Sequence, residues 1–348
     1  MNQTKENHGI TIPTKPFVAL IVALVSIVFA QEASACAAFN CLASKDFQAQ
    51  GLSSEPGLTV GLSYDYINQD RQTIGKNSSV TTIELLNSNP NLYEVKHRIT
   101  TALTTLSVNY NKTDLGVELQ LPYVARTLET FNSALNAPNP PLNISQSNSM
   151  GDARVIGRFS GSDDNSFGLN VGLKLPTGAT DATMSDGVTL FDRSLQPGTG
   201  STDMLVGAYK SGQSDKFGWF VQAMYQTALS TKSDVNNGGT YKPGDSKSIN
   251  IGMRYATFGN KIIPMLQLNM SSRLSDTGTA ATPMITGGEL IYLTPGVTAR
   301  LWGGAMGFIF LQLPVFQDVT ATDVSRPLES GSQLTAQRIL SLGIKHTF

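Results

Sequence analysis

The carboxyl-terminal stretch Leu340-Ser341-Leu342-Gly343-Ile344-Lys345-His346-Thr347-Phe348 decides the fold, because apolar and polar side chains alternate along it up to a terminal aromatic. Alternation at period two places the two sets of side chains on opposite faces of a β-strand. A final strand with one apolar face and an aromatic end suits a barrel whose outer face meets lipid. The stretch therefore predicts a transmembrane β-barrel.

The same alternation recurs through the rest of the chain, beginning at Gly57. The alternation is weaker at 204–209 and less clear at 289–297. The predicted strands lie near 57–66, 102–110, 115–123, 153–159, 167–175, 204–209, 217–225, 249–255, 262–270, 289–297, 305–315 and 340–348. The predicted fold is all-β: a single antiparallel up-and-down barrel of about twelve strands, an even number as in single-chain bacterial barrels.

The connections between these segments alternate in length. Tight turns rich in Asn, Asp, Ser and Gly are expected at 111–114, 162–165, 211–215, 257–260 and 300–303. Long polar segments lie near 71–93, 127–149, 178–200, 229–245, 273–286 and 317–333. A soluble β-sandwich has no reason to sort its connections in this way. We expect the turns and both termini in the periplasm and the long loops outside the cell.

The amino terminus has the features of an export signal. Lys15 precedes the uncharged run 16–30, and Ala33-Ser34-Ala35 supplies the small residues of a cleavage site. The run is shorter than the roughly 20 residues of a membrane-spanning helix. Residues 1–35 are predicted to be a cleaved signal peptide, residues 36–56 a periplasmic segment, and residues 57–348 the barrel. Acylation of Cys36 in a lipoprotein is the alternative.

Both cysteines, Cys36 and Cys41, lie in this periplasmic segment. In an oxidising compartment, two cysteines five positions apart most simply form a small disulfide loop. A redox or metal contact is the rival interpretation. Because the three histidines are His8, His97 and His346, none is near enough in sequence to complete a metal site, and we expect no metal and no cofactor.

Composition excludes several other classes of protein. The net charge is −1 with 15% charged residues, which gives no basic field for nucleic acid. Beyond residue 35 no apolar stretch is long enough for a spanning helix, and the mean hydropathy is −0.07. We expect the outer membrane of a Gram-negative bacterium, contact with its lipid and lipopolysaccharide, and recognition of Phe348 by the barrel assembly machinery.

Residues of the parity opposite to the apolar face are predicted to line the lumen, which is therefore polar. We expect Glu118 and Arg158, on neighbouring strands, to pair and to keep the wall rigid, since inward charges need partners. The predicted polar lining residues are Asp65, Glu118, Gln120, Arg154, Arg158, Lys174, Gln222, Asn250, Arg254, Gln267, Asn269, Gln312 and Lys345.

Apolar side chains of inward parity form a second group: Phe220, Met224, Met306, Phe308 and Phe310. They could meet an apolar solute. They could equally fill a narrow barrel, since eight strands leave room only for side chains and sixteen or more leave an open channel. At about twelve strands the sequence favours filling by a small margin.

The sequence does not indicate catalysis. A hydrolase would need a histidine beside a nucleophile with an orienting polar group. Neither His97 nor His346 has a sequence-adjacent partner that singles it out, so we predict no catalytic residues.

Three motifs resemble those of an outer-membrane barrel family labelled as phenol meta-pathway or transporter proteins. They are Gly172-Leu173-Lys174-Leu175-Pro176-Thr177-Gly178, Gln196-Pro197-Gly198-Thr199-Gly200-Ser201-Thr202-Asp203 and Leu311-Gln312-Leu313-Pro314-Val315-Phe316-Gln317. The resemblance spans roughly residues 57 to 348. It implies a porin-like channel for small, aromatic or hydrophobic compounds, and it brings no catalytic residues.

Two functions of different classes follow as expectations. The first is passage of a small solute through the lumen. The second is a closed barrel that anchors a periplasmic redox or metal-handling partner through the cysteine-containing segment Cys36–Gln50.

Overall fold

The computed structural model describes residues 42–52, 56–78, 94–132, 141–161, 166–234, 239–281, 286–320 and 332–348, which belong to one compact unit. The predicted signal peptide and both cysteines lie outside these residues. None of the described helices is long and apolar enough to cross a membrane.

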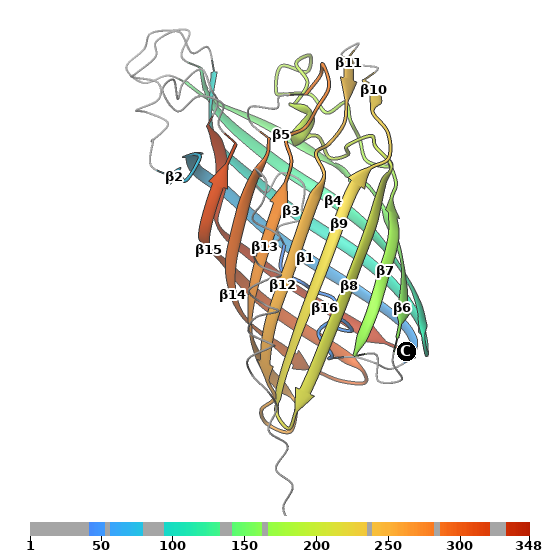
Figure 1. The fold of residues 1–348 in the computed structure, drawn as a ribbon. Coiled ribbons are helices and arrows are strands. Elements are labelled where there is room, and N and C mark those ends of the chain that lie inside the picture. Colours follow the sequence, from blue (N-terminus) through green and yellow to red (C-terminus); the bar gives the residue numbers. More distant parts are fainter. Residues whose placement is uncertain are drawn as a thin grey trace, which may run out of the picture. The chain divides into compact units, whose positions relative to one another are not determined.

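Twelve antiparallel strands form one closed sheet in the described part of the chain, and successive strands lie side by side (Figure 1). This confirms the predicted all-β fold and strand number. The strands are β1 (Gly57–Ile74), β3 (Glu94–Lys112), β4 (Leu115–Asn132), β6 (Arg154–Ser160), β7 (Phe167–Lys174), β8 (Asp203–Ser214), β9 (Phe217–Ala228), β12 (Ser246–Tyr255), β13 (Ile262–Arg273), β14 (Gly288–Arg300), β15 (Ala305–Val319) and β16 (Gln333–Thr347).

Pairing of the last strand with the first closes the barrel. The register between β1 and β16 runs from Thr59 opposite Thr347 to Thr73 opposite Gln333, with irregularities near Gln69. The backbone N–H of Phe348 also donates to the carbonyl of Leu58 at 2.9 Å. Closure leaves no strand edge with unpaired backbone groups along this seam, which is the condition for placing a sheet in hydrocarbon.

The outer face of the barrel is apolar. Along β16, Leu342 and Ile344 are exposed whereas Ser341, which precedes Leu342, is buried, as the alternation predicts. Exposed apolar side chains of the same kind occur on strands all around the sheet: Leu58, Leu62, Leu106, Val117, Val155, Leu169, Val171, Val206, Met253, Leu266, Leu293, Ile309 and Leu313.

Short and long connections lie at opposite ends of the strands, which we call the turn end and the loop end. At the turn end, β3 joins β4 through residues 113–114 and β8 joins β9 through residues 215–216. The predicted turn 162–165 lies outside the described residues. The carboxyl terminus is also at the turn end, as Figure 1 shows.

One expected loop is instead largely strand. Within 127–149, β4 continues to Asn132 and a further strand, β5 (Leu142–Met150), pairs with it from Tyr123 opposite Met150 to Phe131 opposite Leu142. The expectation of a long loop here was wrong because both segments carry polar residues on both faces. An apolar alternation therefore does not mark them.

Smaller elements of secondary structure lie at the loop end. β2 (Asn77–Ser78) pairs with β1, and β10 (Lys232–Asp234) forms a separate hairpin with β11 (Gly239–Tyr241). The connection 175–202 contains a short 3₁₀ helix, η1 (Arg193–Leu195), whose residues Arg193 and Leu195 are buried. This connection folds back toward the lumen.

Apolar residues fill much of the interior in three clusters. At the loop end, Phe191 and Leu195 of the 175–202 connection pack with Ile99, Leu128 and Leu334 of the wall. A second cluster joins three strands of the wall through Ile67, Leu290, Tyr292, Ala336 and Ile339. The third cluster lies at the turn end and includes residues that precede β1.

Candidate functional site

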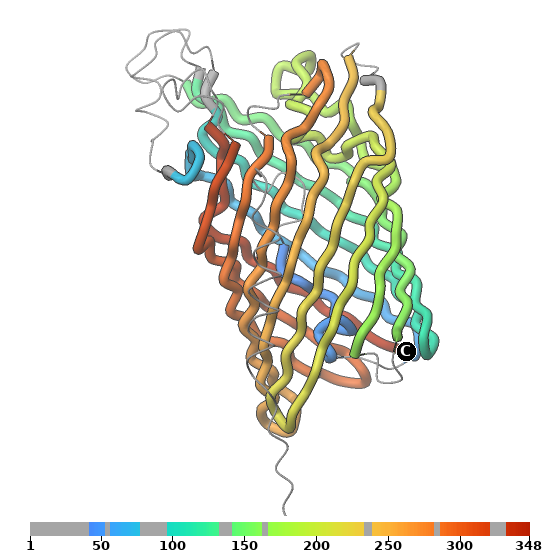
Figure 2. The backbone as a smooth tube through the Cα atoms, in the orientation of Figure 1, coloured from blue at the N-terminus to red at the C-terminus, as the bar shows by residue number. Residues whose placement is uncertain are grey.

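Residues Leu42–Leu52, which we call the inner segment, lie inside the barrel. Ala43, Phe47 and Leu52 are buried in one cluster with side chains of β9, β13 and β15. The ring of Phe47 meets that of Phe308 edge to face, with centroids 5.7 Å apart. The inner segment is drawn in blue within the outline of the barrel in Figure 2. The sequence placed it in the periplasm, where it would have had no such contacts.

The apolar inward residues therefore serve mainly to fill the lumen. Phe220, Met306, Phe308 and Phe310 all belong to the cluster around the inner segment. Met224 is the exception, since it lines a cavity described below. The segment supplies Ala43, Phe47 and Leu52, which the alternation of the strands could not reveal because they come from a part of the chain without strand periodicity.

Ion pairs hold the inner segment to the wall. Asp46 accepts a hydrogen bond from Arg158 at 2.5 Å, and Lys45 donates to Asp65 at 2.5 Å. Arg158 also donates to Gln48 at 2.5 Å. Charge-assisted hydrogen bonds of this kind are roughly twice as strong as neutral ones.

Further hydrogen bonds add to this anchoring. Arg254 donates to the carbonyls of Gln50 at 3.1 Å and Gly51 at 2.8 Å. Gln312 accepts from the N–H of Ala43 at 2.7 Å, and Gln222 accepts from the Ser44 hydroxyl at 2.7 Å. Inward side chains thereby satisfy several backbone groups of the segment, which has no strand partner, and others are bonded within the segment.

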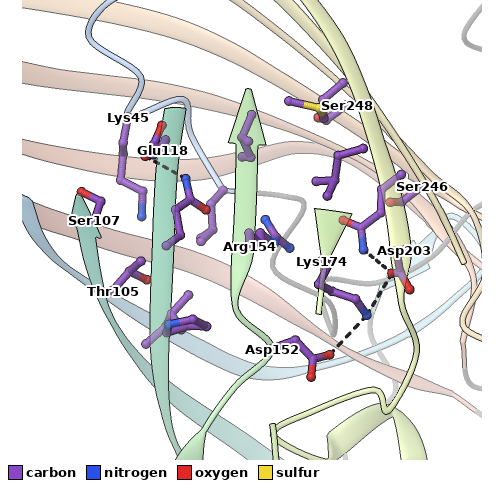
Figure 3. A pocket seen from close by; sticks show the side chains of 18 of the residues that line it. Lys45, Thr105, Ser107, Glu118, Asp152, Arg154, Lys174, Asp203, Ser246 and Ser248 are labelled. Atoms are coloured by element: carbon purple, nitrogen blue, oxygen red, sulfur yellow. Dashed lines mark hydrogen bonds and ion pairs between the residues drawn. The ribbon is translucent and has the colours of Figure 1, made fainter. Parts of the chain in front are cut away.

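A cavity lies between the inner segment and the loop end. Its volume is about 270 Å³, counted as the space in which the centre of a water molecule fits. Its floor is Leu42–Asp46, and the residues that cap it come from 193–199 and 241–244. The wall between them is formed by β1, β3, β4, β6, β7, β8, β9 and β12, with Arg273 of β13 and Lys345 of β16, and Figure 3 shows side chains that project from it into the space.

A buried ammonium group holds two carboxylates on this wall. Lys174 lies 3.2 Å from Asp152 and 2.9 Å from Asp203, as the dashed lines in Figure 3 show. It also contacts the hydroxyls of Thr199 and Ser201. Because these buried charges are paired and make further hydrogen bonds, the free-energy cost of removing them from water is offset.

The group of Lys174, Asp152 and Asp203 also binds the connection 175–202, which supplies part of the cap of the cavity. Asp152 accepts from the backbone N–H of Gly178 at 3.1 Å and from that of Thr199 at 2.8 Å. Gly178 and Gly198 touch so closely that a Cβ built on either would lie 2.5 to 2.6 Å from the other's backbone. The two motifs of the family resemblance, 172–178 and 196–203, therefore meet in space at this contact.

Tyr241 of the β10–β11 hairpin completes the cap. Its ring lies under the guanidinium of Arg193, 4.7 Å from the ring centroid, and its hydroxyl donates to Asp276 at 2.8 Å. Burial raises the pKa of Tyr241 well above its ordinary value, so the phenol stays protonated and keeps donating. Asp276 also accepts from Arg273, which fixes the hairpin to β13.

Positive charge predominates around the cavity. Seven described cationic side chains line it against four carboxylates. They are Lys45, Arg154, Arg158, Lys174, Arg193, Arg273 and Lys345 against Asp46, Glu118, Asp152 and Asp203.

The structure places the predicted lining residues in three groups. Nine line the cavity: Glu118, Gln120, Arg154, Arg158, Lys174, Gln222, Met224, Asn250 and Lys345. Several contact the inner segment: Asp65, Arg158, Gln222, Arg254, Gln267, Gln312, Phe308 and Lys345, with Phe220 and Phe310 in the same cluster. Asn269 is buried and bonds Asn250 and Thr294.

The predicted pair Glu118 and Arg158 exists, but it is not the principal contact of Arg158. Its atoms lie 3.9 Å apart, whereas Asp46 is at 2.5 Å. Sequence reasoning missed Asp46, Asp152, Asp203 and Arg193 as interior residues. Asp46 precedes β1, Asp152 and Arg193 lie in connections, and Asp203 is the first residue of β8, just before the predicted strand 204–209, so alternation gave no signal for them.

The described residues show no cluster of three His, Cys, Asp or Glu side chains that could hold a metal ion. The ring of His97 lies 5.0 Å from that of Phe131, and His346 lies 4.4 Å from Phe348. Both histidines thus lie beside aromatic rings.

Comparison with known proteins gives the fold. No protein-family model and no curated protein matches the chain. It is similar to an outer membrane channel from Pseudomonas putida F1, with a TM-score of 0.59 and 12% identity over 88% of this chain and 100% of that one. The CymD monoaromatic hydrocarbon channel has a TM-score of 0.45 and 11% identity, over 91% of this chain and 98% of that one. The family resemblance of the motifs stays a prediction.

Proposed function

We propose that the protein is an outer-membrane channel that admits a small organic solute. The observation that carries this is a closed barrel with an apolar outer face around a polar cavity of about 270 Å³. Only closed barrels and helices satisfy their backbone groups in hydrocarbon. The lumen is the part of such a protein that water and solute reach. The P. putida channel of the same fold is consistent with this role.

The proposed orientation follows from the two ends of the barrel. The turn end, with the inner segment and the carboxyl terminus, faces the periplasm, and the loop end faces outward. The outer face contacts lipid and lipopolysaccharide. Phe348, which is 73% exposed, is available to the barrel assembly machinery. The signal peptide of residues 1–35 and a disulfide between Cys36 and Cys41 remain proposals, and the function involves no catalysis.

The channel is closed in this conformation. The inner segment forms the floor of the cavity and packs against β9, β13 and β15, so a solute that reaches the cavity meets it. Passage toward the turn end requires the segment to move. We therefore expect slow, selective passage and not the free diffusion of an open porin.

Uptake into proteoliposomes tests the proposal. We expect purified protein to admit single-ring solutes but exclude oligosaccharides, whereas liposomes containing heat-unfolded protein should admit neither. A chain without residues 42–52 should admit solutes faster. If both correctly folded barrels admit no solute and show no conductance, the channel function is refuted.

The closed floor also favours a second candidate, a scaffold that presents the Cys36–Gln50 segment to a periplasmic redox or metal-handling protein. Cross-linking in cells should then capture one partner from the native chain and lose it when Cys36 and Cys41 are changed to serine. An unchanged set of cross-linked proteins would count against the scaffold.

A further inference from the structure

We propose that the solute carries a carbonyl group, whose oxygen accepts hydrogen bonds from the amide nitrogens of Asn170, Gln222 and Asn250 in the cavity. This deepens the proposed channel function and rests on it. The hydrogen bonds of these three side chains and the apolar wall beside them lead to this inference.

The three amide side chains are buried and line the cavity. Asn170 of β7, Gln222 of β9 and Asn250 of β12 have exposed fractions of 2%, 8% and 8%. Gln222 and Asn250 occupy directly paired positions, so their side chains lie next to each other on the inner face. A donor or acceptor at such a depth gains free energy from a partner that water does not freely supply.

The oxygens of Gln222 and Asn250 are already engaged. Gln222 accepts from the Ser44 hydroxyl at 2.7 Å, and Asn250 accepts from the amide nitrogen of Asn269 at 2.7 Å. Asn269 presents its nitrogen to Asn250 because its own oxygen accepts from the hydroxyl of Thr294. The orientation of the Asn250 amide follows from this chain of hydrogen bonds, and its nitrogen points away from Asn269.

The oxygen of Asn170 is engaged as well. It accepts from the guanidinium of Arg158 at 3.4 Å. Since an arginine can only donate, the atom of Asn170 that faces it must be the oxygen. Arg158 in turn holds Asp46 of the inner segment, just as Gln222 holds Ser44. The amides therefore lie beside the floor of the cavity.

The nitrogens of all three amides are left over. Within the part of the chain that the structure describes, none of them has a hydrogen-bond partner. Each nitrogen can donate two hydrogen bonds. A buried donor without an acceptor costs free energy, so a solute that brings an acceptor oxygen gains over one that brings only carbon. A carbonyl oxygen has two lone pairs and no hydrogen of its own that would need a partner.

The charged groups on the neighbouring wall are engaged with one another. Lys174 lies within 3.2 Å of both Asp152 and Asp203. The charges of these two carboxylates also act on Arg154. Recognition of the solute at the floor therefore falls to the uncharged amides.

Apolar side chains supply the rest of the site. Ile156 and Leu205 lie on either side of Gly172 in paired positions, and Met224 lies opposite Gly207. A Cβ built on Gly207 would lie 3.0 Å from the sulfur of Met224, so the glycine makes room for this side chain against the wall. A cavity of about 150 Å³ already holds benzene. This larger cavity has room for one ring with a carbonyl substituent.

Calorimetric binding to the full barrel in detergent tests the inference with acetophenone and α-methylstyrene. The two probes have the same shape, but the second has a CH₂ group in place of the carbonyl oxygen. The heat of partition into empty micelles is subtracted. We expect acetophenone to bind roughly tenfold more tightly or better, because α-methylstyrene leaves the amide nitrogens without an acceptor. 1-Phenylethanol, whose hydroxyl must itself donate, should bind with intermediate affinity.

Two variants locate the site. Asn250→Leu removes one nitrogen at nearly constant volume, and Gln222→Met removes the other. Each should reduce the advantage of acetophenone several-fold, whereas unchanged binding of α-methylstyrene shows that the cavity is intact. The matched control is Asn148→Leu, an exposed asparagine of β5, which should change the binding of neither probe.

Equal binding of acetophenone and α-methylstyrene to the native chain overturns the inference, and so does the absence of any binding. A full acetophenone advantage in both variants overturns the assignment to these amides. In each case, solute uptake or conductance in proteoliposomes leaves the channel function standing. If no probe binds, no solute enters and no conductance appears, the proposed function fails as well.

Discussion

The carboxylate of Asp46 and the guanidinium of Arg158 join the inner segment to strand β6 at 2.5 Å, although the two residues are 112 positions apart. This contact makes the floor of the cavity depend on a side chain of the wall. Four predictions follow from it and from three other contacts of the lumen.

Arg158→Ala should release the inner segment. Asp46 would lose its ion pair and Gln48 its hydrogen bond. The free energy of unfolding, measured in urea, should therefore fall by roughly 2 kcal/mol. The cost is below the range for fully buried pairs because the side chain of Asp46 is 18% exposed. In a background with Cys36 and Cys41 changed to serine, Ala43→Cys should react with maleimide at least tenfold faster. Arg338→Ala, an exposed arginine of β16, is the control, and equal rates in both variants would contradict the prediction.

Removing residues 42–52 should open the turn end. The cluster of Phe47, Phe220 and Phe308 would lose its central member, and a continuous path along the lumen should appear as a larger single-channel conductance. The control replaces the same residues with Gly and Ser at equal length, which keeps the chain but removes its contacts. It should behave like the deletion, and native conductance in both chains would show that the segment is not the barrier.

Gly198→Ala should displace the cap. Its new Cβ would lie 2.5 Å from the backbone of Gly178, so one of the two backbone segments must shift, at a cost in stability of about 1–3 kcal/mol. We expect faster protease cleavage between residues 176 and 202 in the folded barrel. Gly157→Ala is the matched control, because a Cβ there meets only ordinary contacts. Native cleavage rates in Gly198→Ala would refute a tight cap.

Lys174→Met should destabilise the barrel strongly. Asp152 and Asp203 would be left buried without their shared cation, a change that typically costs about 3–5 kcal/mol. Urea unfolding in vesicles measures the loss. Changing both carboxylates to asparagine in the same chain should recover part of it, whereas Lys247→Met should stay within about 0.5 kcal/mol of the native chain. A small loss in Lys174→Met would mean that water already screens the group.

Much of the barrel could be predicted because strand periodicity reports it directly. The apolar outward face of β16 and the inward position of Asp65 or Lys174 follow from alternation alone. The weaker segments around Met204 and Leu290 are the strands β8 and β14, as their place in the series of segments predicts.

The floor and cap of the cavity could not be predicted in the same way. Leu42–Leu52 and the connection 175–202 have no regular period. Leu42–Leu52 is positioned by contacts with wall residues more than a hundred positions away, and the connection by contacts such as that of Arg126 with Leu195. The 172–178 and 196–203 motifs both contain glycines, which in the sequence alone mark only the family resemblance. Only the folded chain shows that they approach each other.

The pairing of β1 with β16 constrains the order in which the parts of this protein can assemble. The inner segment directly precedes β1 and is enclosed by a wall that only the last residues of the chain complete. A chain that joins its ends before the segment has entered would have to admit it later through the narrow turn end. We infer that entry of the segment and joining of the ends are coupled steps, so a loss of Phe47 contacts would slow maturation even where the finished barrel is stable.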